Sequence, residues 1–236
     1  MIYGGILAGG TGSRMATATI PKQFIRVDGI PVFIRTLNTF LSVEAIDKVV
    51  VSINAEWKSY YENFLIEYSI DQSRVILTTG GNSRFTSLKN ITQAAYDDCH
   101  DDNAIIVTHD CARLFVSKRI ITDNITMIPQ FDMVTTSLQT IDTMLYSEDG
   151  VHCTAVPDRT KLWNDQGPQT YRVGDFLRYY EMIPEAELPE YIEAGKLFRS
   201  QGKRVGIVPG DRLNFKITND IDLDYAEFLI KMGVVK

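Results

Sequence analysis

The stretch KVVVSI, Lys48–Ile53, is apolar on both faces of an extended chain. Such a strand is typical of a parallel sheet that helices cover on both sides. A second stretch of this kind, AIIVT at Ala104–Thr108, predicts another buried strand. The two stretches together favour an α/β fold.

Outward from Lys48–Ile53, short β-branched runs alternate with longer amphipathic ones, which predicts a doubly wound, mostly parallel sheet. Ligands of such sheets bind beyond the carboxyl ends of the strands. Further strands are predicted at Ile2–Leu7, Arg74–Thr78, Met133–Leu138 and Arg204–Val208. Helices are predicted at Val32–Leu41, Glu56–Tyr68, Ser83–Ala95, Lys118–Met127, Val173–Met182, Leu188–Ser200 and Asp220–Met232.

Residues from about 139 to 172 interrupt this alternation and predict a protruding β-arm with a turn near Glu148–Gly150. An arm outside the sheet must bury its apolar face, and we expect a partner subunit to cover it, with docking on its own domain as the alternative. The sequence has no repeat and no low-complexity linker, so residues 1–236 are predicted to form a single domain.

Composition narrows the class of protein. The net charge is -6 without a basic block, which argues against a nucleic-acid polymer as partner. No apolar run reaches the roughly 18 residues of a membrane span, and Met1–Tyr3 does not begin a signal peptide. Cys99, Cys111 and Cys153 lack metal-site spacing and indicate a reducing compartment. We therefore expect a cytoplasmic protein without a membrane partner.

A glycine-rich loop follows the first predicted strand, in the segment LAGGTGSRM. Glycine permits positive φ and lets backbone N–H groups approach an anion closely. Arg14 and Lys22 then neutralise a polyphosphate from two sides, whereas the alternative is a tight turn with two solvated cations. The Walker pattern and the GxGxxG pattern are both absent, which sets aside a hydride-transfer enzyme.

LAGGTGSRM with PKQF resembles the LxAGGxGxRM…PKQ signature of sugar-phosphate nucleotidyltransferases. More narrowly, it is similar to the cytidylyltransferases that act on methylerythritol phosphate or ribitol 5-phosphate, and the likeness extends over almost the whole chain. It implies a Rossmann-like nucleotidyltransferase fold whose glycine loop holds the triphosphate of CTP. The nucleotide-binding residues implied here are Leu7, Ala8, Gly9, Gly10 and Gly12, and Arg14 and Lys22 are implied to be catalytic.

GGNSRFTSL resembles the family's GGxxRxxSV segment, which recognises cytosine, and implies that Gly81, Asn82 and Ser87 contact the nucleotide. Ser83 is predicted to cap the next helix. Two interpretations of Arg84 stay open, a solvated helix cation or a side chain that faces the triphosphate.

AIIVTHDCARLF places Asp110 just after a buried strand, where a carboxylate suits Mg²⁺. The segment resembles the family's HDAARP or HDSVRP, which implies that Asp110 holds Mg²⁺ (or another divalent cation) or the acceptor, and that Arg113 lies at the acceptor end. The alternatives are a helix cap for Asp110 and an ion pair between the two residues. His109 is predicted to be a structural hydrogen-bonding residue and not a base.

GDRLNFKIT resembles the GxxxNxKIT segment and implies a catalytic role for Lys216 at the α-phosphate, where negative charge gathers in the transition state. Its alternative is a solvated lysine.

TIDTM and PDRTKLWNDQGPQTY resemble the arm segments of the family, in which the arm crosses a dimer interface. Thr143 and Arg159 are thereby implied to reach the acceptor phosphate of the partner in a homodimer. An ion pair between Asp142 and Arg159 is the alternative. Gly167 replaces the threonine of the family's TPQ, and Ile192–Glu193 replaces its Thr-Asp pair, both on the acceptor side, which leaves the identity of the acceptor open.

The resemblance predicts transfer of CMP from CTP to a polyol phosphate with release of pyrophosphate. Seven residues separate Arg14 from Lys22, and this spacing, with GGILAGG, VTHD and EAGKLF, is more similar to the ribitol group. We therefore expect D-ribitol 5-phosphate as acceptor and CDP-ribitol for a cell-surface polymer as product. Methylerythritol phosphate, for isoprenoid synthesis, is the runner-up, and another pentitol or sugar phosphate is a third possibility. A nucleotide-binding relative without turnover is the alternative from another class, against which the intact Arg14, Lys22, Asp110 and Lys216 argue.

Overall fold

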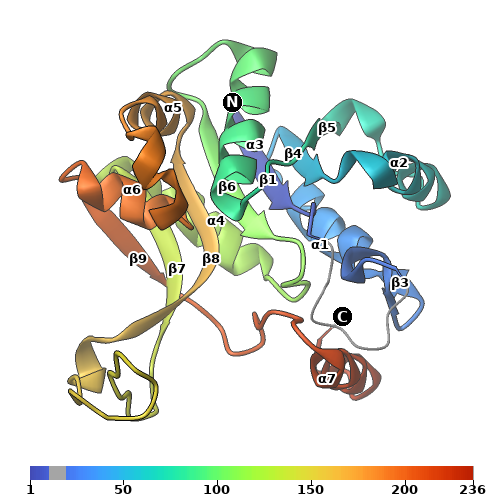
Figure 1. Cartoon of the computed structure of the whole chain (residues 1–236). Coiled ribbons are helices and arrows are strands. Elements are labelled where there is room, and N and C mark those ends of the chain that lie inside the picture. The colour runs from blue at the N-terminus through green and yellow to red at the C-terminus, as the bar shows by residue number, and fades with distance from the viewer. Residues whose placement is uncertain (11–19, 236) are drawn as a thin grey trace.

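A seven-stranded sheet forms the centre of the molecule, with strand order β5-β4-β1-β6-β8-β7-β9 (Figure 1). The computed structural model describes residues 1–10 and 20–235. The strands are β1 (Ile2–Leu7), β4 (Lys48–Ile53), β5 (Val75–Thr79), β6 (Ile105–Asp110), β7 (Met133–Gln139), β8 (Trp163–Arg172) and β9 (Val205–Pro209), and a small second sheet holds β2 (Arg26–Val27) and β3 (Ile30–Pro31). β8 alone runs antiparallel to its neighbours β6 and β7, so the predicted mostly parallel α/β fold is confirmed.

Helices cover both faces of this sheet, as the two-sided apolar strands require. Along β4, Val49 and Val51 pack into one core with α1, α2, α4 and α7, and Val50 packs into the other with α3, α5 and α6. The helices are α1 (Val32–Leu41), α2 (Lys58–Glu67), α3 (Arg84–Cys99), α4 (Lys118–Met127), α5 (Val173–Glu181), α6 (Ala194–Ser200) and α7 (Asp220–Lys231). Short 3-10 turns stand at η1 (Lys22–Phe24), η2 (Ala55–Trp57), η3 (Gln72–Arg74), η4 (Ile128–Gln130), η5 (Arg159–Lys161) and η6 (Glu185–Glu190).

The glycines of β1 allow these helices to approach the sheet closely. A Cβ atom on Gly4 would lie 2.6 Å from the Phe40 ring of α1, and one on Gly5 would lie 3.0 Å from Ile91 of α3. Both distances are shorter than a van der Waals contact, so a larger residue at either position would push a helix away from the sheet.

The predicted arm is shorter than the range from about 139 to 172. Residues Trp163–Arg172 form β8, which pairs with β6 from Gln169 onward and with β7 along most of its length. The prediction of a hairpin outside the sheet was therefore wrong for this limb, because a strand that returns antiparallel into a parallel sheet has no distinct pattern of its own. What projects from the body is the segment between β7 and β8, closed by a bridge between Tyr146 and Ala155 (Figure 1).

The bounds of most other elements agree with the predictions within a few residues, and those of α1 and α4 agree fully. The predicted helix Leu188–Ser200 is in fact η6 followed by α6. Its break falls at Glu193, whose side chain accepts hydrogen bonds from the N–H groups of Gly195 and Lys196 and so caps α6. Within residues 1–10 and 20–235, no helix is long and apolar enough to cross a lipid bilayer.

Candidate active site

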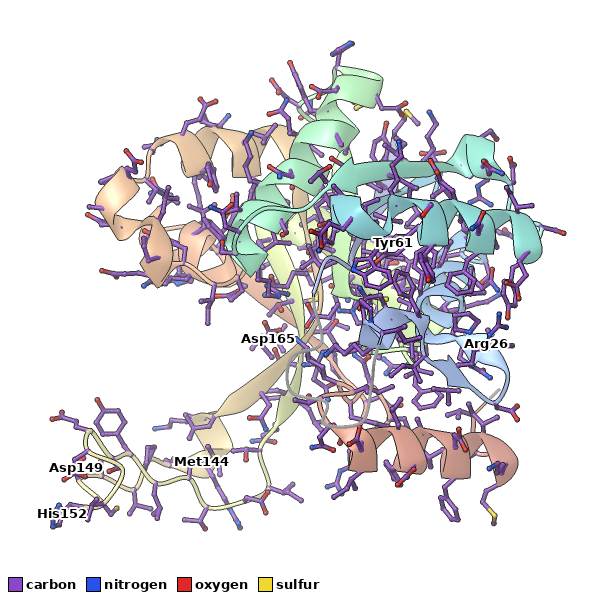
Figure 2. All side chains as sticks on the ribbon, turned by 45° about the vertical axis from the view of Figure 1, so that its right-hand side comes forward. Arg26, Tyr61, Met144, Asp149, His152 and Asp165 are labelled. Carbon is purple, nitrogen blue, oxygen red and sulfur yellow. The ribbon has the colours of Figure 1, made fainter. Side chains whose placement is uncertain are left out.

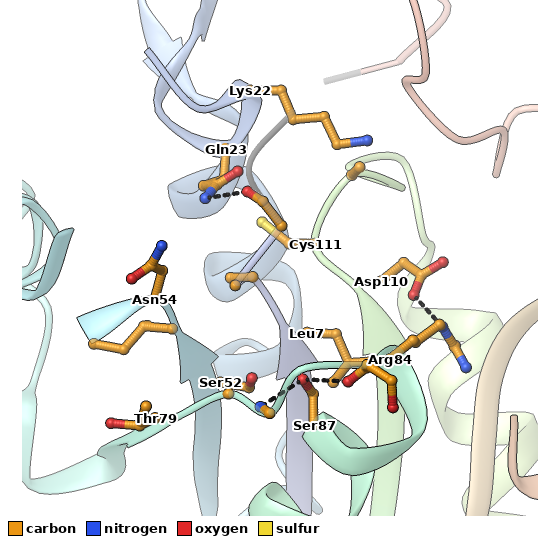
Figure 3. Close-up of a pocket in the computed structure, with 18 of the residues that line it drawn as sticks. Leu7, Lys22, Gln23, Ser52, Asn54, Thr79, Arg84, Ser87, Asp110 and Cys111 are labelled. Atoms are coloured by element: carbon orange, nitrogen blue, oxygen red, sulfur yellow. Dashed lines mark hydrogen bonds and ion pairs between the residues drawn. The ribbon is translucent and has the colours of Figure 1, made fainter. Parts of the chain in front are cut away.

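A cavity of about 720 Å³ lies at the carboxyl ends of β1, β4 and β6, where ligands bind in sheets of this type (Figure 3). It brings together most of the residues that the sequence proposed for the nucleotide and the metal. Those that line it are Leu7, Ala8, Gly9, Gly10, Lys22, Gly81, Asn82, Ser87, Asp110 and Lys216. Gly12 and Arg14 lie outside the described residues, so the roles expected of them stay predictions.

One wall of the cavity is the turn before α3. The Oγ of Ser87 accepts a hydrogen bond from the N–H of Gly81 at 3.0 Å and donates one to the carbonyl of Ser83 at 2.9 Å. Ser83 also caps α3, as predicted, by accepting from the N–H of Thr86. A Cβ atom on Gly81 would lie only 2.4 Å from the Thr86 side chain, so glycine is required there. The turn is therefore held in place by these hydrogen bonds and by close packing.

Several further residues line the cavity although no role in the site was predicted for them. Ser52, Asn54 and Thr79 line the cavity from the ends of β4 and β5, and Gln23 lines it from η1. Their position at the carboxyl ends of two predicted strands was the signal that could have found the first three.

Asp110 lies at the centre of a charged cluster at the other end of the cavity (Figure 3). Its carboxylate accepts hydrogen bonds from the Arg84 Nε at 3.0 Å and from the Lys216 Nζ at 2.7 Å. The Asp110 side chain is 13% exposed. Burial alone would raise the pKa of this carboxyl, but the charges of Arg84 and Lys216 outweigh it and hold the pKa well below the ordinary value. Asp110 is therefore an anion at neutral pH.

The contacts of Arg84 decide between the two interpretations of this residue, a solvated cation or a side chain of the site. Besides Asp110, its guanidinium donates to the carbonyl of Ile192 at 3.0 Å, and the side chain lines the cavity. Arg84 is thus a fixed cation of the cavity and not a fully solvated one.

Lys22 and Lys216 come from opposite ends of the chain to the same cavity. The Nζ of Lys22 donates to the carbonyl of Ile217 at 2.8 Å, directly beside Lys216 in the sequence. The N–H of Ile217 in turn donates to the carbonyl of Ala112 in the loop after β6. This chain of hydrogen bonds ties the segment of the two lysines to the loop that directly follows Asp110.

Comparison with known proteins identifies this arrangement of loops and cations. The family model described as IspD, 2-C-methyl-D-erythritol 4-phosphate cytidylyltransferase, matches residues 4–232. The chain belongs to this family of nucleotidyltransferases. It is 38% identical over 234 residues to a ribitol-5-phosphate cytidylyltransferase of Streptococcus pneumoniae, a match that covers 98% of this chain and 99% of the relative.

Solved structures share the fold. The 4-diphosphocytidyl-2C-methyl-D-erythritol synthase of Anaerococcus prevotii has a TM-score of 0.82 at 24% identity, with 98% of this chain and 96% of that chain covered. The 2-C-methyl-D-erythritol 4-phosphate cytidylyltransferase of Francisella tularensis has a TM-score of 0.79 at 23% identity, with 96% and 98% covered. At these identities the likeness shows the Rossmann-like nucleotidyltransferase fold.

The residues around the HD segment of this IspD-family member have structural roles besides the site. His109 is 1% exposed and its Nε2 lies 3.1 Å from the carbonyl of Arg113, in agreement with the predicted structural hydrogen bond. Burial lowers the pKa of His109 to about 4, so the ring is neutral at pH 7 and donates from Nε2. Burial raises the pKa of the Cys111 thiol to about 12, which leaves it protonated and unsuited to nucleophilic attack.

Arg113 does not line the cavity in this chain. Its Nη1 donates to the carbonyl of Asn214 at 2.9 Å, and its Nε lies 3.9 Å from Asp110. The ion pair that was the alternative to an acceptor role thus exists, at the long end of the range for such pairs.

Thr143 and Arg159 lie on the arm, away from the cavity of their own chain. Figure 2 shows Met144, Asp149 and His152 far out on this arm and Asp165 at its base. The Nη1 of Arg159 donates to the carbonyl of Ile141 at 2.7 Å, and among the described residues no ion pair joins Arg159 to Asp142. Because their predicted role concerns a partner's site, it stays a prediction.

The two departures from the family pattern have separate structural reasons. Gly167 has φ +65°, and a Cβ atom there would lie 3.4 Å from the His109 Nδ1. Glu193 is engaged by the cap of α6 and by the Nε2 of Gln169, at 2.7 Å. Its carboxylate therefore stabilises a helix.

Proposed function

We propose that the protein transfers CMP from CTP to D-ribitol 5-phosphate and releases pyrophosphate. The observation that carries this proposal is the 38% identity to a ribitol-5-phosphate cytidylyltransferase over nearly the full length of both chains. The cavity supports it, because three cationic side chains, Lys22, Arg84 and Lys216, line the place where a triphosphate and an acceptor phosphate must meet.

In the proposed reaction, an oxygen of the acceptor phosphate attacks the α-phosphorus of CTP and the bond to pyrophosphate breaks. The attacking phosphate is already anionic near neutral pH, so no general base is needed. Catalysis then rests on positioning and on neutralising charge. Lys216 neutralises the α-phosphoryl oxygens, while Lys22 and Arg14 stabilise the leaving pyrophosphate.

We propose Mg²⁺ as the cofactor, held by Asp110 together with the phosphates of CTP. Within the described residues no group of three acidic, His or Cys side chains could hold a metal ion. A single carboxylate nevertheless fits Mg²⁺, which is usually bound by one or two carboxylates plus substrate phosphates. When bound, the ion would offset negative charge on the phosphates.

The acceptor end of the site is proposed to be completed by the arm of a second copy. Arg113 lies behind Asp110, but Thr143 and Arg159 do not reach the cavity of their own chain. The arm exposes large apolar side chains that would be covered in a homodimer. They are Ile141, Met144, Leu145, Tyr146, Val151 and Val156.

Methylerythritol phosphate is the second candidate acceptor, because the matching family model carries the name of that activity. The two acceptors share the phosphate that attacks and differ in the carbon chain, so the CTP half of the site serves either one. Gly167 and Ile192, which replace acceptor-side residues of the family, distinguish this chain from that pattern.

Pyrophosphate release from CTP and Mg²⁺ tests the proposal, with D-ribitol 5-phosphate, methylerythritol 4-phosphate and unphosphorylated ribitol as parallel acceptors. We expect release with ribitol 5-phosphate and none with ribitol, which lacks the phosphate group whose oxygen attacks. Release with methylerythritol phosphate alone would reverse the acceptor. Tight CTP binding without release from any acceptor would identify a binding protein without turnover.

A further inference from the structure

Two buried side chains donate hydrogen bonds to backbone carbonyls at the start of the glycine loop. The Tyr61 hydroxyl of α2 donates to the carbonyl of Ala8 at 2.6 Å. The Nε2 of Gln23 in η1 donates to the carbonyl of Gly10 at 3.1 Å (Figure 3). Tyr61 is 0% exposed and does not line the cavity, whereas Ala8, Gly9 and Gly10 line it, and so does Gln23. The Ala8 carbonyl therefore points into the protein, and the Gly10 carbonyl points to a side chain of the cavity wall.

The direction of a carbonyl fixes the direction of the next N–H, because the peptide unit is planar and trans. With the Ala8 oxygen on Tyr61, the N–H of Gly9 points to the opposite side, away from the interior. That side is the cavity, which Gly9 lines. An N–H directed there attracts a phosphate, whereas a carbonyl oxygen in its place would repel it.

Tyr61 is itself held firmly. Its ring makes edge contacts with Phe24 and Phe33, each at 4.9 Å between centroids, within the interior that Figure 2 shows around it. Burial raises the pKa of this hydroxyl well above its usual value, so it remains an O–H donor at every pH at which the protein is used. The rings pack without help from the hydroxyl, so the hydrogen bond to Ala8 is separable from the packing.

We infer that Tyr61, together with Gln23, is a positioning residue of the nucleotide site, because its hydroxyl fixes the Ala8–Gly9 peptide with the N–H toward the triphosphate. The inference rests on the proposed function, in which CTP occupies this cavity. It assigns to α2 a role in phosphate binding.

Tyr61→Phe tests this, with affinities for CTP and for cytidine measured on the full-length protein. A neutral hydrogen bond contributes about 1 kcal/mol, so we expect CTP to bind roughly threefold to tenfold more weakly. Cytidine carries no phosphate and is expected to bind as it does to the wild type. The loss is expected to appear in the KM for CTP more than in kcat. A variant that binds CTP as the wild type does, or that loses CTP and cytidine equally, would overturn the inference.

Tyr171→Phe is the matched control. Tyr171 is also 0% exposed, and its hydroxyl lies 3.1 Å from the Thr92 Oγ1, away from the cavity. This variant is expected to lower Tm as Tyr61→Phe does while leaving both affinities unchanged. A selective loss of CTP affinity in Tyr171→Phe would show that any buried hydroxyl has this effect and would refute the assignment.

Gln23→Met keeps the test decisive if Tyr61→Phe does not fold, because it removes the donor to Gly10 with little change in volume. The same selective loss of CTP affinity is expected, and its absence would contradict the inference. A wild type that binds CTP but releases no pyrophosphate would overturn the proposed function alone. A wild type that binds no CTP would overturn both.

Discussion

The Nζ of Lys216 lies 2.7 Å from the Oδ2 of Asp110, although 106 positions separate the two residues in the sequence. The other carboxylate oxygen of Asp110 receives the Arg84 Nε, from the start of α3. One carboxylate thus holds two cations from distant elements at the same end of the cavity. Preorganised cations of this kind need no reorganisation when negative charge develops on a phosphoryl group.

Lys216→Met removes the cation from this cluster and keeps a side chain of similar length. Loss of one preorganised charge donor typically costs a factor of 10² to 10³, so kcat is expected to fall by about that much. Steady-state pyrophosphate release at saturating CTP measures it.

Lys48→Met is the control for that loss. Lys48 makes an ion pair with Asp98, also at 2.7 Å, with 30% exposure against 33% for Lys216, and it does not line the cavity. Its kcat should stay near that of the wild type. Equal losses of kcat in Lys216→Met and Lys48→Met would mean that the ion pair of Lys216 with Asp110 matters for stability and not for catalysis.

Lys22→Ala is expected to lower kcat by at least about a hundredfold with the fold intact. The substitution removes the hydrogen bond from the charged Lys22 Nζ to Ile217 O, which contributes about 1.5–3 kcal/mol against a total stability of about 5–15 kcal/mol. Circular dichroism and Tm check the fold, and pyrophosphate release checks the rate. Lys58→Ala, at an exposed lysine of α2, should change neither. A Lys22→Ala enzyme with a near-normal rate would exclude the lysine from the proposed role.

The layers of the fold could be predicted because their signal is local. Val49, Val50 and Val51 alternate between two cores. Apolar residues on both faces of a strand are visible in the sequence and predict that both faces are buried. β8 could not be predicted in the same way. Its outer half, Trp163–Asp165, is exposed and its inner half is buried, so no single period describes the strand.

Some residues of the candidate site could likewise be predicted from sequence motifs, and others could not. Gly9, Lys22 and Asp110 stand in short motifs whose chemistry can be interpreted without a structure. Tyr61 stands in no motif, and only the fold places its hydroxyl under Ala8. The partner of Arg84 likewise depends on how β6 and α3 meet at the edge of the cavity.

Acid is expected to destabilise the protein through His109. The free energy of unfolding is measured without nucleotide or metal. The pKa of His109 is about 4 in the fold and about 6.5 in the unfolded chain, so between these values the unfolded chain binds a proton that the fold does not. The free energy of unfolding therefore falls as pH falls from about 6.5 to about 4, by at most about 1.4 kcal/mol per pH unit from this group. Urea unfolding of wild type and His109→Gln over this range checks it. Parallel curves for the two proteins would contradict the assignment.

Mixing two inactive variants distinguishes an arm that serves a partner's cavity from one that serves its own. Lys216→Met disables the cavity, and Arg159→Ala disables the arm, whose guanidinium otherwise has only the carbonyl of Ile141 as a hydrogen-bond partner among the described residues. If the arm crosses a two-fold interface, a mixed dimer has one site made from the intact cavity of one copy and the intact arm of the other. Subunits refolded together at equal amounts should then recover about a quarter of wild-type activity, since about half of the dimers are mixed and each has one good site. Each variant refolded alone is the control and should stay inactive. A mixture no more active than its components would show that every arm serves its own chain, because in that case no combination of subunits restores a complete site.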